Sequence, residues 1–161
     1  MAKNRHLTAA AALAAALLIS PATARAAAAE PEAESPVLDW VVTLKSGTRP
    51  LFMHQGDTWS LYGHLHERTA DRGPGAKIGD MTARCTAVLV HARGHVQQCE
   101  RVLRTDAGHL SLSDAMDVEG PGPHGAPAAV TGGTGAYADA EGEARITARG
   151  GTIEFRITLD D

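Results

Sequence analysis

Residues 129–143 read Ala-Val-Thr-Gly-Gly-Thr-Gly-Ala-Tyr-Ala-Asp-Ala-Glu-Gly-Glu, and this stretch decides the fold. The pattern is typical of a strand, a glycine-rich turn and a second strand. Closely spaced glycines allow backbone angles that are closed to other residues, and they allow a neighbouring chain to approach closely. We expect a positive backbone angle at Gly133 or Gly135, and Tyr137 follows with an apolar ring and a polar tip. The structural glycines expected here are Gly132, Gly133, Gly135 and Gly142, the last at a bulge or bend.

A phosphate-binding loop is the first alternative for this glycine-rich segment. Such a loop carries a Lys after its last glycine and leads into a helix whose amide groups point at the anion. Here Ala136 and Tyr137 follow, and the next residues have a strand pattern. The segment therefore does not predict nucleotide binding.

The N-terminal residues 1–26 are typical of a secretory signal peptide. A basic start precedes an apolar run over residues 7–19, and small residues around Ala24 and Ala26 suit cleavage. The run is short for a membrane span, so an anchor is the weaker interpretation. We expect residues 27–36, rich in Ala, Glu and Pro, to form a disordered leader. Residues 37–161 then form one domain, and the protein is expected to be secreted.

The charge of the mature chain limits its partners. Cleavage after Ala26 leaves 161 − 26 = 135 residues, enough for one domain with a core, and a formal charge of (15 − 3) − 19 = −7. Nucleic-acid binding depends on Lys and Arg to neutralise phosphates, and anionic membrane surfaces attract basic segments. The acidic balance predicts neither kind of partner.

Alternation of apolar and polar residues predicts an all-β domain. The period of two is clearest at residues 39–44, 58–66, 109–113 and 151–160, and strand-like runs also cover 82–91 and 95–105. Turn clusters rich in Gly, Pro and Asp separate these runs. About eight short strands imply a sandwich or a closed barrel. The interior candidates are Trp40, Trp59, Leu61, Leu65, Leu110, Leu112, Phe155 and Ile157.

Cys85 and Cys99 are the two cysteines of the chain. An even pair in a secreted protein is most simply one disulfide, with free thiols or a catalytic Cys as the alternative. The runs 82–91 and 95–105 flank a tight turn at Ala92-Arg93-Gly94, which brings the two cysteines nearly opposite each other. The bond would close a loop of about 15 residues and stabilise the fold by about 3 kcal/mol.

The glycine-rich turn resembles the signature of the allene oxide cyclase and dirigent barrels. That signature is an apolar residue followed by Thr-Gly-Gly-Thr/Ser-Gly-x-Phe/Tyr-x-x-Ala-x-Gly, and residues 131–142 match it. Upstream, the order of Gly56-Asp57, Leu65, Lys77-Ile78-Gly79 and Cys85-Thr86 is similar to bacterial secreted members. The resemblance implies a single antiparallel barrel of about eight strands, an apolar cavity for a small hydrophobic molecule, and a homotrimer.

The resemblance and the strand pattern together give candidate site residues. Reactions in the family are ring closures and guided couplings, in which the protein orients a flexible molecule and places polar groups where charge develops. Each residue also has a structural alternative: apolar residues simply pack, Asp57 stabilises a turn, Tyr137 packs behind the glycines, and Asp139 and Glu141 face solvent. The catalytic candidates are Asp57, Tyr137 and Glu141, and the ligand-binding candidates are Trp59, Leu61, Tyr62, Leu110, Leu112 and Phe155.

Other chemistries have less support in the sequence. Ala138 and Glu141 stand where plant dirigent proteins carry Arg, and no Gly-x-Ser-x-Gly motif suggests a hydrolase. His64 and His66 point to one face of a strand, which would be half of a metal site, but that face is opposite the apolar one. We therefore expect an exposed histidine pair, no metal and no cofactor.

The sequence leads to two functional hypotheses. The first is a secreted barrel that binds a small hydrophobic molecule, with isomerase or cyclase activity by orientation of a reactive substrate. The second is a non-catalytic extracellular binding or protein-interaction barrel. An open pocket would favour the first, and an interior filled by Trp and Phe would favour the second.

Overall fold

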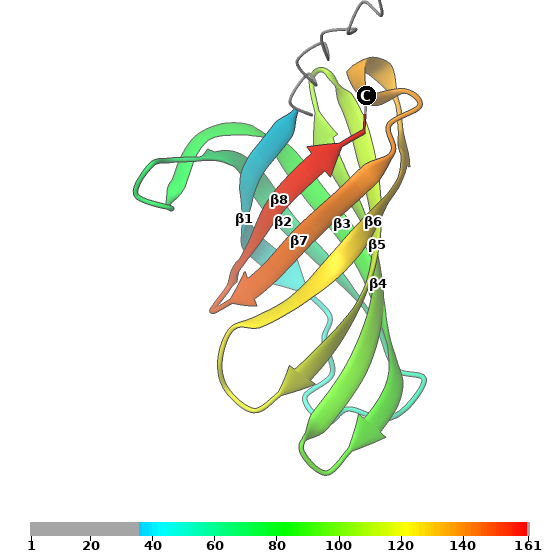
Figure 1. Ribbon diagram of the computed structural model, residues 1–161. Coiled ribbons are helices and arrows are strands. Elements are labelled where there is room, and N and C mark those ends of the chain that lie inside the picture. The colour runs from blue at the N-terminus through cyan, green and yellow to red at the C-terminus, as the bar shows by residue number, and fades with distance from the viewer. Residues whose placement is uncertain (1–35, 161) are drawn as a thin grey trace, which may run out of the picture. The chain divides into compact units, whose positions relative to one another are not determined.

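The computed structural model describes residues 36–160, and the expected signal peptide and most of the expected leader lie outside the described residues. The described chain is all-β and forms a closed antiparallel barrel in which each strand pairs with its neighbours in sequence and β1 pairs with β8 (Figure 1). The predicted fold class is confirmed, including the number of strands. The strands are β1 (Val37–Gly47), β2 (Thr58–Arg68), β3 (Pro74–His91), β4 (Gly94–Thr105), β5 (Gly108–Glu119), β6 (His124–Gly133), β7 (Gly142–Arg149) and β8 (Thr152–Leu159).

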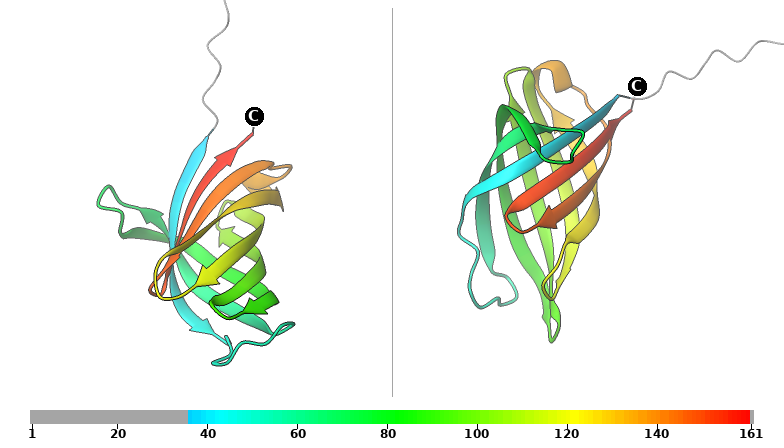
Figure 2. Two further views of the ribbon diagram at one scale, coloured as in Figure 1. Left: turned by 60° about the horizontal axis from the view of Figure 1, so that its bottom comes forward. Right: turned by 90° about the vertical axis from the view of Figure 1, so that its left-hand side faces the viewer.

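The connections gather at two ends of the barrel. The loops at 69–73, 106–107 and 134–141 lie at one end with the start of β1 and the end of β8, which we call the upper end (Figure 1). The loops at 48–57, 92–93, 120–123 and 150–151 lie at the other, which we call the lower end. The two further views in Figure 2 show the strands wound obliquely around the barrel, as closure of a twisted sheet requires.

Side chains fill the barrel from the upper end down past its middle. Alternate residues of each strand point inward, and these are apolar over most of the barrel length. Apolar burial is the main favourable term in folding, at about 25 cal/mol per Å². The fully or almost fully buried members of this core are Val42, Leu65, Met81, Leu103, Leu110, Leu112, Met116, Ile146, Phe155 and Ile157.

The predicted disulfide is present in the hairpin of β3 and β4. Cys85 and Cys99 are direct partners in the register, with Cα atoms 4.1 Å apart and sulfur atoms 2.01 Å apart. Both point into the barrel and pack against Trp59 and Ala87. The bond therefore fixes the β3–β4 pairing from inside, just below the apolar core.

The glycine-rich segment forms the end of β6 and a single 3₁₀ turn, η1 (Gly135–Tyr137). Gly135 has φ +64°, and a Cβ atom there would lie 2.4 Å from the carbonyl oxygen of Ala107. The expectation of a positive angle is thus met at Gly135, whereas Gly133 is needed for close approach, since its Cβ would lie 2.3 Å from the carbonyl oxygen of Tyr137. The segment folds against the β4–β5 turn and closes the upper end.

Replacing Gly135 should destabilise the barrel. An alanine at this position combines a left-handed backbone angle with a steric clash, so we expect Gly135→Ala to lower the free energy of unfolding by more than about 1 kcal/mol. Urea denaturation measures this, with Gly73→Ala as the control, because the nearest atom to a Cβ at Gly73 is the Thr69 hydroxyl at 3.6 Å. Equal unfolding midpoints for the two variants would contradict the importance of the turn.

Candidate functional site

A cavity of about 380 Å³ enters the barrel from its lower end. Its lining runs from exposed loop residues such as Gly120 and Gly150 to the buried side chains of Trp59, Met116 and Ile153. The rim of the cavity is therefore exposed to solvent, and the side chains deeper in the barrel are mostly apolar. A larger hollow of about 520 Å³ is lined by outward-facing residues such as Thr82, Arg84 and Glu100, and is a groove on the outer face of the sheet.

A buried ion pair lies at the cavity wall, to which its member Arg101 belongs. Arg101 on β4 is 2% exposed and Asp114 on β5 is 4% exposed. The Arg101 Nε donates to Asp114 Oδ1 at 2.6 Å, and Nη2 donates to Oδ2 at 3.2 Å. The two residues are diagonal neighbours on the inward face, because Cys99 pairs with Asp114 and Arg101 pairs with Leu112. This two-point contact fixes the orientation of the guanidinium group.

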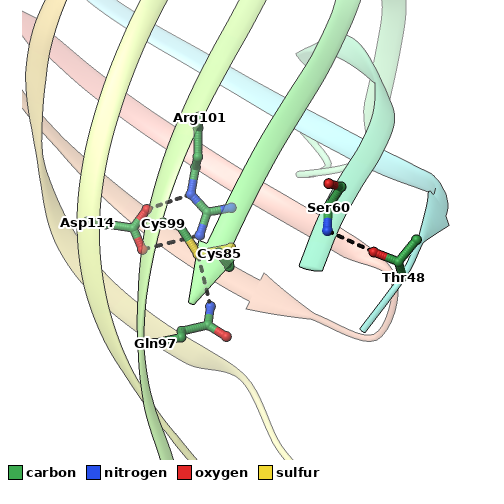
Figure 3. The surroundings of a disulfide bond; sticks show 7 residues. All are labelled: Thr48, Ser60, Cys85, Gln97, Cys99, Arg101 and Asp114. Carbon is green, nitrogen blue, oxygen red and sulfur yellow. Dashed lines mark hydrogen bonds and ion pairs between the residues drawn. A yellow bond between two sulfur atoms is a disulfide. The ribbon is translucent and has the colours of Figure 1, made fainter. Parts of the chain in front are cut away.

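One nitrogen of this guanidinium group has no partner among the described residues. Nη1 of Arg101 is buried and no acceptor lies within hydrogen-bond distance. Figure 3 shows this nitrogen pointing away from Asp114. Gln97 lies on the same inward face of β4, closer to the lower end, and its side-chain amide donates to the sulfur of Cys99 at 3.5 Å. An unsatisfied buried donor costs about 1–3 kcal/mol, so such groups are rare in folded proteins. Arg101 lines the cavity, and Nη1 is the one nitrogen of its guanidinium group that lacks a hydrogen-bond partner among the described residues.

His95 lies beside the cavity on the same face of β4. It is 5% exposed, its ring packs edge-to-face on Trp59 at 6.1 Å, and its Nε2 is buried without a hydrogen-bond partner. Burial lowers the pKa of His95 below the usual value of 6.5, and the positive charge of Arg49 lowers this pKa further. The imidazole is therefore neutral at neutral pH.

The structure divides the predicted ligand-binding residues into three groups. Trp59 and Leu61 line the cavity. Leu110, Leu112 and Phe155 are buried in the core above it. Tyr62 points to the outer face of β2, where its hydroxyl donates to Asp80 at 3.5 Å.

The predicted catalytic residues are not brought together. Asp57 lies in the lower-end loop and accepts a hydrogen bond from the backbone N–H of His54 at 2.7 Å, as a turn-stabilising residue does. Tyr137 lies at the upper end, where its ring packs edge-to-face against Trp40 with centroids 6.1 Å apart. Asp139 and Glu141 are exposed at that end. None of these four belongs to the lining of the cavity.

His64 and His66 point outward from β2, as expected, but both are half-buried rather than exposed. The His66 ring lies within hydrogen-bond distance of the Thr43 hydroxyl and the Gly75 carbonyl oxygen, at 3.2 and 3.1 Å. Within residues 36–160, no group of three or more His, Cys, Asp or Glu side chains is arranged to hold a metal ion. Among the same residues, no helix is long and apolar enough to cross a membrane.

Arg101, Asp114, Gln97 and His95 were not among the residues that the sequence singled out. The signal was nevertheless available from the period of two. Cys99 and Leu103 are inward residues, so Arg101 between them must point inward too. On β5, Leu110 and Leu112 are inward residues, so the next alternate residue, Asp114, must point inward as well.

Comparison with known proteins supports the fold. No protein-family model matches the chain, and no curated protein matches it. Solved structures do match, and one of them is pyocyanin demethylase, with a TM-score of 0.60 and 20% sequence identity. The match covers 78% of this chain and 100% of that protein. At this identity the likeness shows the fold alone, and membership of the allene oxide cyclase and dirigent superfamily stays a prediction.

Breaking the buried ion pair should destabilise the protein strongly. Asp114→Asn removes the charge that compensates the buried guanidinium group, and we expect a loss of about 3–5 kcal/mol in the free energy of unfolding. The control is Asp80→Asn, because Asp80 makes the same two-point contact with Arg104, at 2.6 and 2.8 Å, on the outer face. There the loss should be about 1 kcal/mol or less. Urea denaturation compares the two, and equal losses would mean that burial of the pair is unimportant.

The lowered pKa of His95 predicts a pH-dependent stability. Unfolded chains take up the proton near pH 6.5, whereas the folded protein does so only at lower pH. The free energy of unfolding should therefore fall as the pH drops below about 6.5, with no such effect above it.

The variant His95→Gln should show a smaller decrease in stability between about pH 6.5 and 5 than the wild type in chemical denaturation. His64, whose pKa is also lowered, first by burial and then by the charge of Lys77, adds a decrease of the same sign in both proteins. The control is His109→Gln on the exposed face. A His95→Gln curve parallel to that of the wild type would contradict the assignment.

Proposed function

We propose that this protein is a secreted barrel that binds a small hydrophobic molecule in the lower-end cavity. We further propose that it orients this molecule for an isomerisation or cyclisation. The observation that carries the proposal is the cavity itself, which combines an apolar wall with one fixed, buried guanidinium group. Its volume of about 380 Å³ lies in the range of small-molecule sites.

The lining suits an apolar or aromatic body. Trp59 supplies a large flat surface, and Leu61, Met116 and Ile153 supply aliphatic contacts, of which Met adapts most readily to different shapes. Eight paired strands hold these side chains in place. Because these side chains are already held in place, binding would restrict the conformation of the ligand and would cost the protein little conformational entropy.

Orientation can accelerate a reaction within one molecule. A site that holds reacting atoms in contact supplies much of the barrier reduction, and a fixed polar group stabilises charge that develops in the transition state. In this cavity that group is Arg101, held by Asp114. The proposed reaction does not use Asp57, Tyr137 or Glu141, since these residues lie outside the cavity.

Two further observations support the proposal. The structural neighbour named above is by its name an enzyme that demethylates pyocyanin, so a barrel of this shape can serve small-molecule chemistry. The disulfide between Cys85 and Cys99 is compatible with an oxidising compartment and hence with export.

Exposed apolar side chains favour the second candidate function, a protein-interaction barrel. Leu51 and Phe52 in the lower-end loop are 91% and 78% exposed, and Val88 and Leu89 near the end of β3 are 41% and 48% exposed. Large contiguous patches of exposed apolar side chains mark interaction sites. A second copy of the chain is one such partner, as the proposed homotrimer requires.

Binding of a neutral fluorescent probe tests the proposed function. N-phenyl-1-naphthylamine brightens when it enters an apolar site, and we expect saturable binding of one molecule per chain. Ala148→Trp fills the cavity from β7 and should abolish this binding. Ala129→Trp, on the exposed face of β6, is the matched control and should leave it unchanged. Equal binding by both variants would place the probe outside the cavity and contradict the proposal.

The reaction itself needs a separate measurement. The protein is incubated with extract of the medium in which the source cells grow, and compounds retained in native mass spectrometry are released and separated by chromatography. A released compound with the mass of an extract component but a new retention time supports an isomerase or cyclase. A compound that is released unchanged contradicts the reaction and leaves a binding protein.

A further inference from the structure

We infer that the lower-end cavity selects ligands with an anionic oxygen group, such as a carboxylate, attached to an apolar body. This inference rests on the proposed function and adds the chemical class of the ligand. It assigns the anionic group to Arg101 and the apolar body to the surface formed by Trp59, Leu61, Met116 and Ile153.

The charged groups of the cavity wall have one sign. Arg49, Arg101 and Arg149 line it, whereas no acidic side chain belongs to the lining among the described residues. Asp114, an inward-facing acid of the barrel wall, is already bound to Arg101. A cleft lined by one sign of charge with apolar walls concentrates its field and attracts ligands of the opposite charge. This local positive charge contrasts with the formal net charge of −4 of the whole chain.

The buried guanidinium group needs an acceptor. Asp114 engages the edge of Arg101 formed by Nε and Nη2, and leaves both hydrogens of Nη1 without a partner. A carboxylate oxygen of a ligand would satisfy this donor and form a charge-assisted hydrogen bond, about twice as strong as a neutral one. Since the ion pair holds the guanidinium plane in advance, little side-chain entropy is lost when the bond forms.

Arg49 and Arg149 complete the arrangement at the rim. The net charge of the Arg101–Asp114 pair is zero, so the pair alone would not favour a full negative charge by long-range attraction. The Arg49 guanidinium lies 6.0 Å from the centroid of the Trp59 ring, and Arg149 lies at the end of β7. These two supply the excess positive charge, while Nη1 of Arg101 supplies the directed contact. The influence of Arg49 also reaches His95, whose pKa it lowers.

The test compares two probes that differ only in the charged group. These are 1-naphthylacetate and its neutral amide, 1-naphthylacetamide, titrated by calorimetry at neutral pH and low salt. We expect the wild type to bind the acid at least about tenfold more tightly than the amide, as a charge-assisted hydrogen bond implies. Added salt should reduce this preference, because it screens the rim charges.

Two double variants locate the preference. Arg101→Gln with Asp114→Asn removes both charges of the pair together and leaves two neutral polar side chains, and it should reduce the preference for the acid to the part, about threefold, that the rim arginines supply. Its matched control is Arg104→Gln with Asp80→Asn, the equivalent pair outside the barrel, which should change neither affinity. Arg49→Gln with Arg149→Gln alters only exposed residues and should weaken acid binding about threefold while making it less salt-dependent. This rim variant keeps the inference testable if the buried variant does not fold.

The outcomes separate the two proposals. Equal affinity of the wild type for acid and amide would overturn the anion preference and leave the cavity as a neutral binding site. A preference for the acid that is as large in both double variants as in the wild type would also overturn the inference, because the anion would then bind elsewhere. Failure of both naphthyl compounds and of N-phenyl-1-naphthylamine to bind would remove the proposed function together with this inference.

Discussion

Pairing of β1 with β8 is the constraint on which the rest of the structure depends. The pairing runs from Val37 opposite Thr158 to Thr43 opposite Thr152, and it leaves no free edge. Once the sheet is closed, every alternate residue on each strand must lie inside, whatever its chemistry. A polar residue at an inward position cannot escape by a shift of register, because such a shift would turn a whole strand inside out. Arg101 and Asp114 are held in the interior for this reason.

The interior of the barrel is divided along its axis. Toward the upper end, the space between strands is filled by residues such as Phe155, Leu65 and Met81 and capped by Tyr137. Toward the lower end, the disulfide, Gln97 and the ion pair replace this packing, and the cavity begins. An apolar pair at positions 101 and 114 would give similar or greater stability, since desolvation of two charges largely offsets their attraction. Stability alone therefore does not account for a charged pair at these two positions.

Local signals in the sequence were sufficient for the all-β class, and the choice of a closed barrel over a sandwich came from the resemblance of the glycine-rich turn to a known family. Alternation predicted most of the strands at least in part, turn residues separated them, and the spacing of Cys85 and Cys99 predicted their pairing. The clear alternation in this part of the sequence covered residues 109–113, whereas β5 continues to Glu119. The next inward residue is Asp114, and a polar residue at an inward position interrupts the pattern that identifies a strand. Asp114, which interrupts the apolar pattern, is thus the residue that holds Arg101. The two residues lie on different strands, so no local sequence pattern reveals that they form a pair.

The glycine-rich turn and the cavity lie at opposite ends of the barrel. A sequence match at the turn therefore concerns a different part of the molecule from the one that would bind a ligand. Gly133 and Gly135 are required by backbone contacts at the upper end, and those contacts would be the same for any ligand. The cavity is lined by side chains of the lower-end loops and of strand ends, which can change without disturbing that turn. A match at the glycine turn therefore carries information about the barrel and none about the ligand. The ligand has to be argued from the lower end, where the free nitrogen of Arg101 is the most specific feature of the wall.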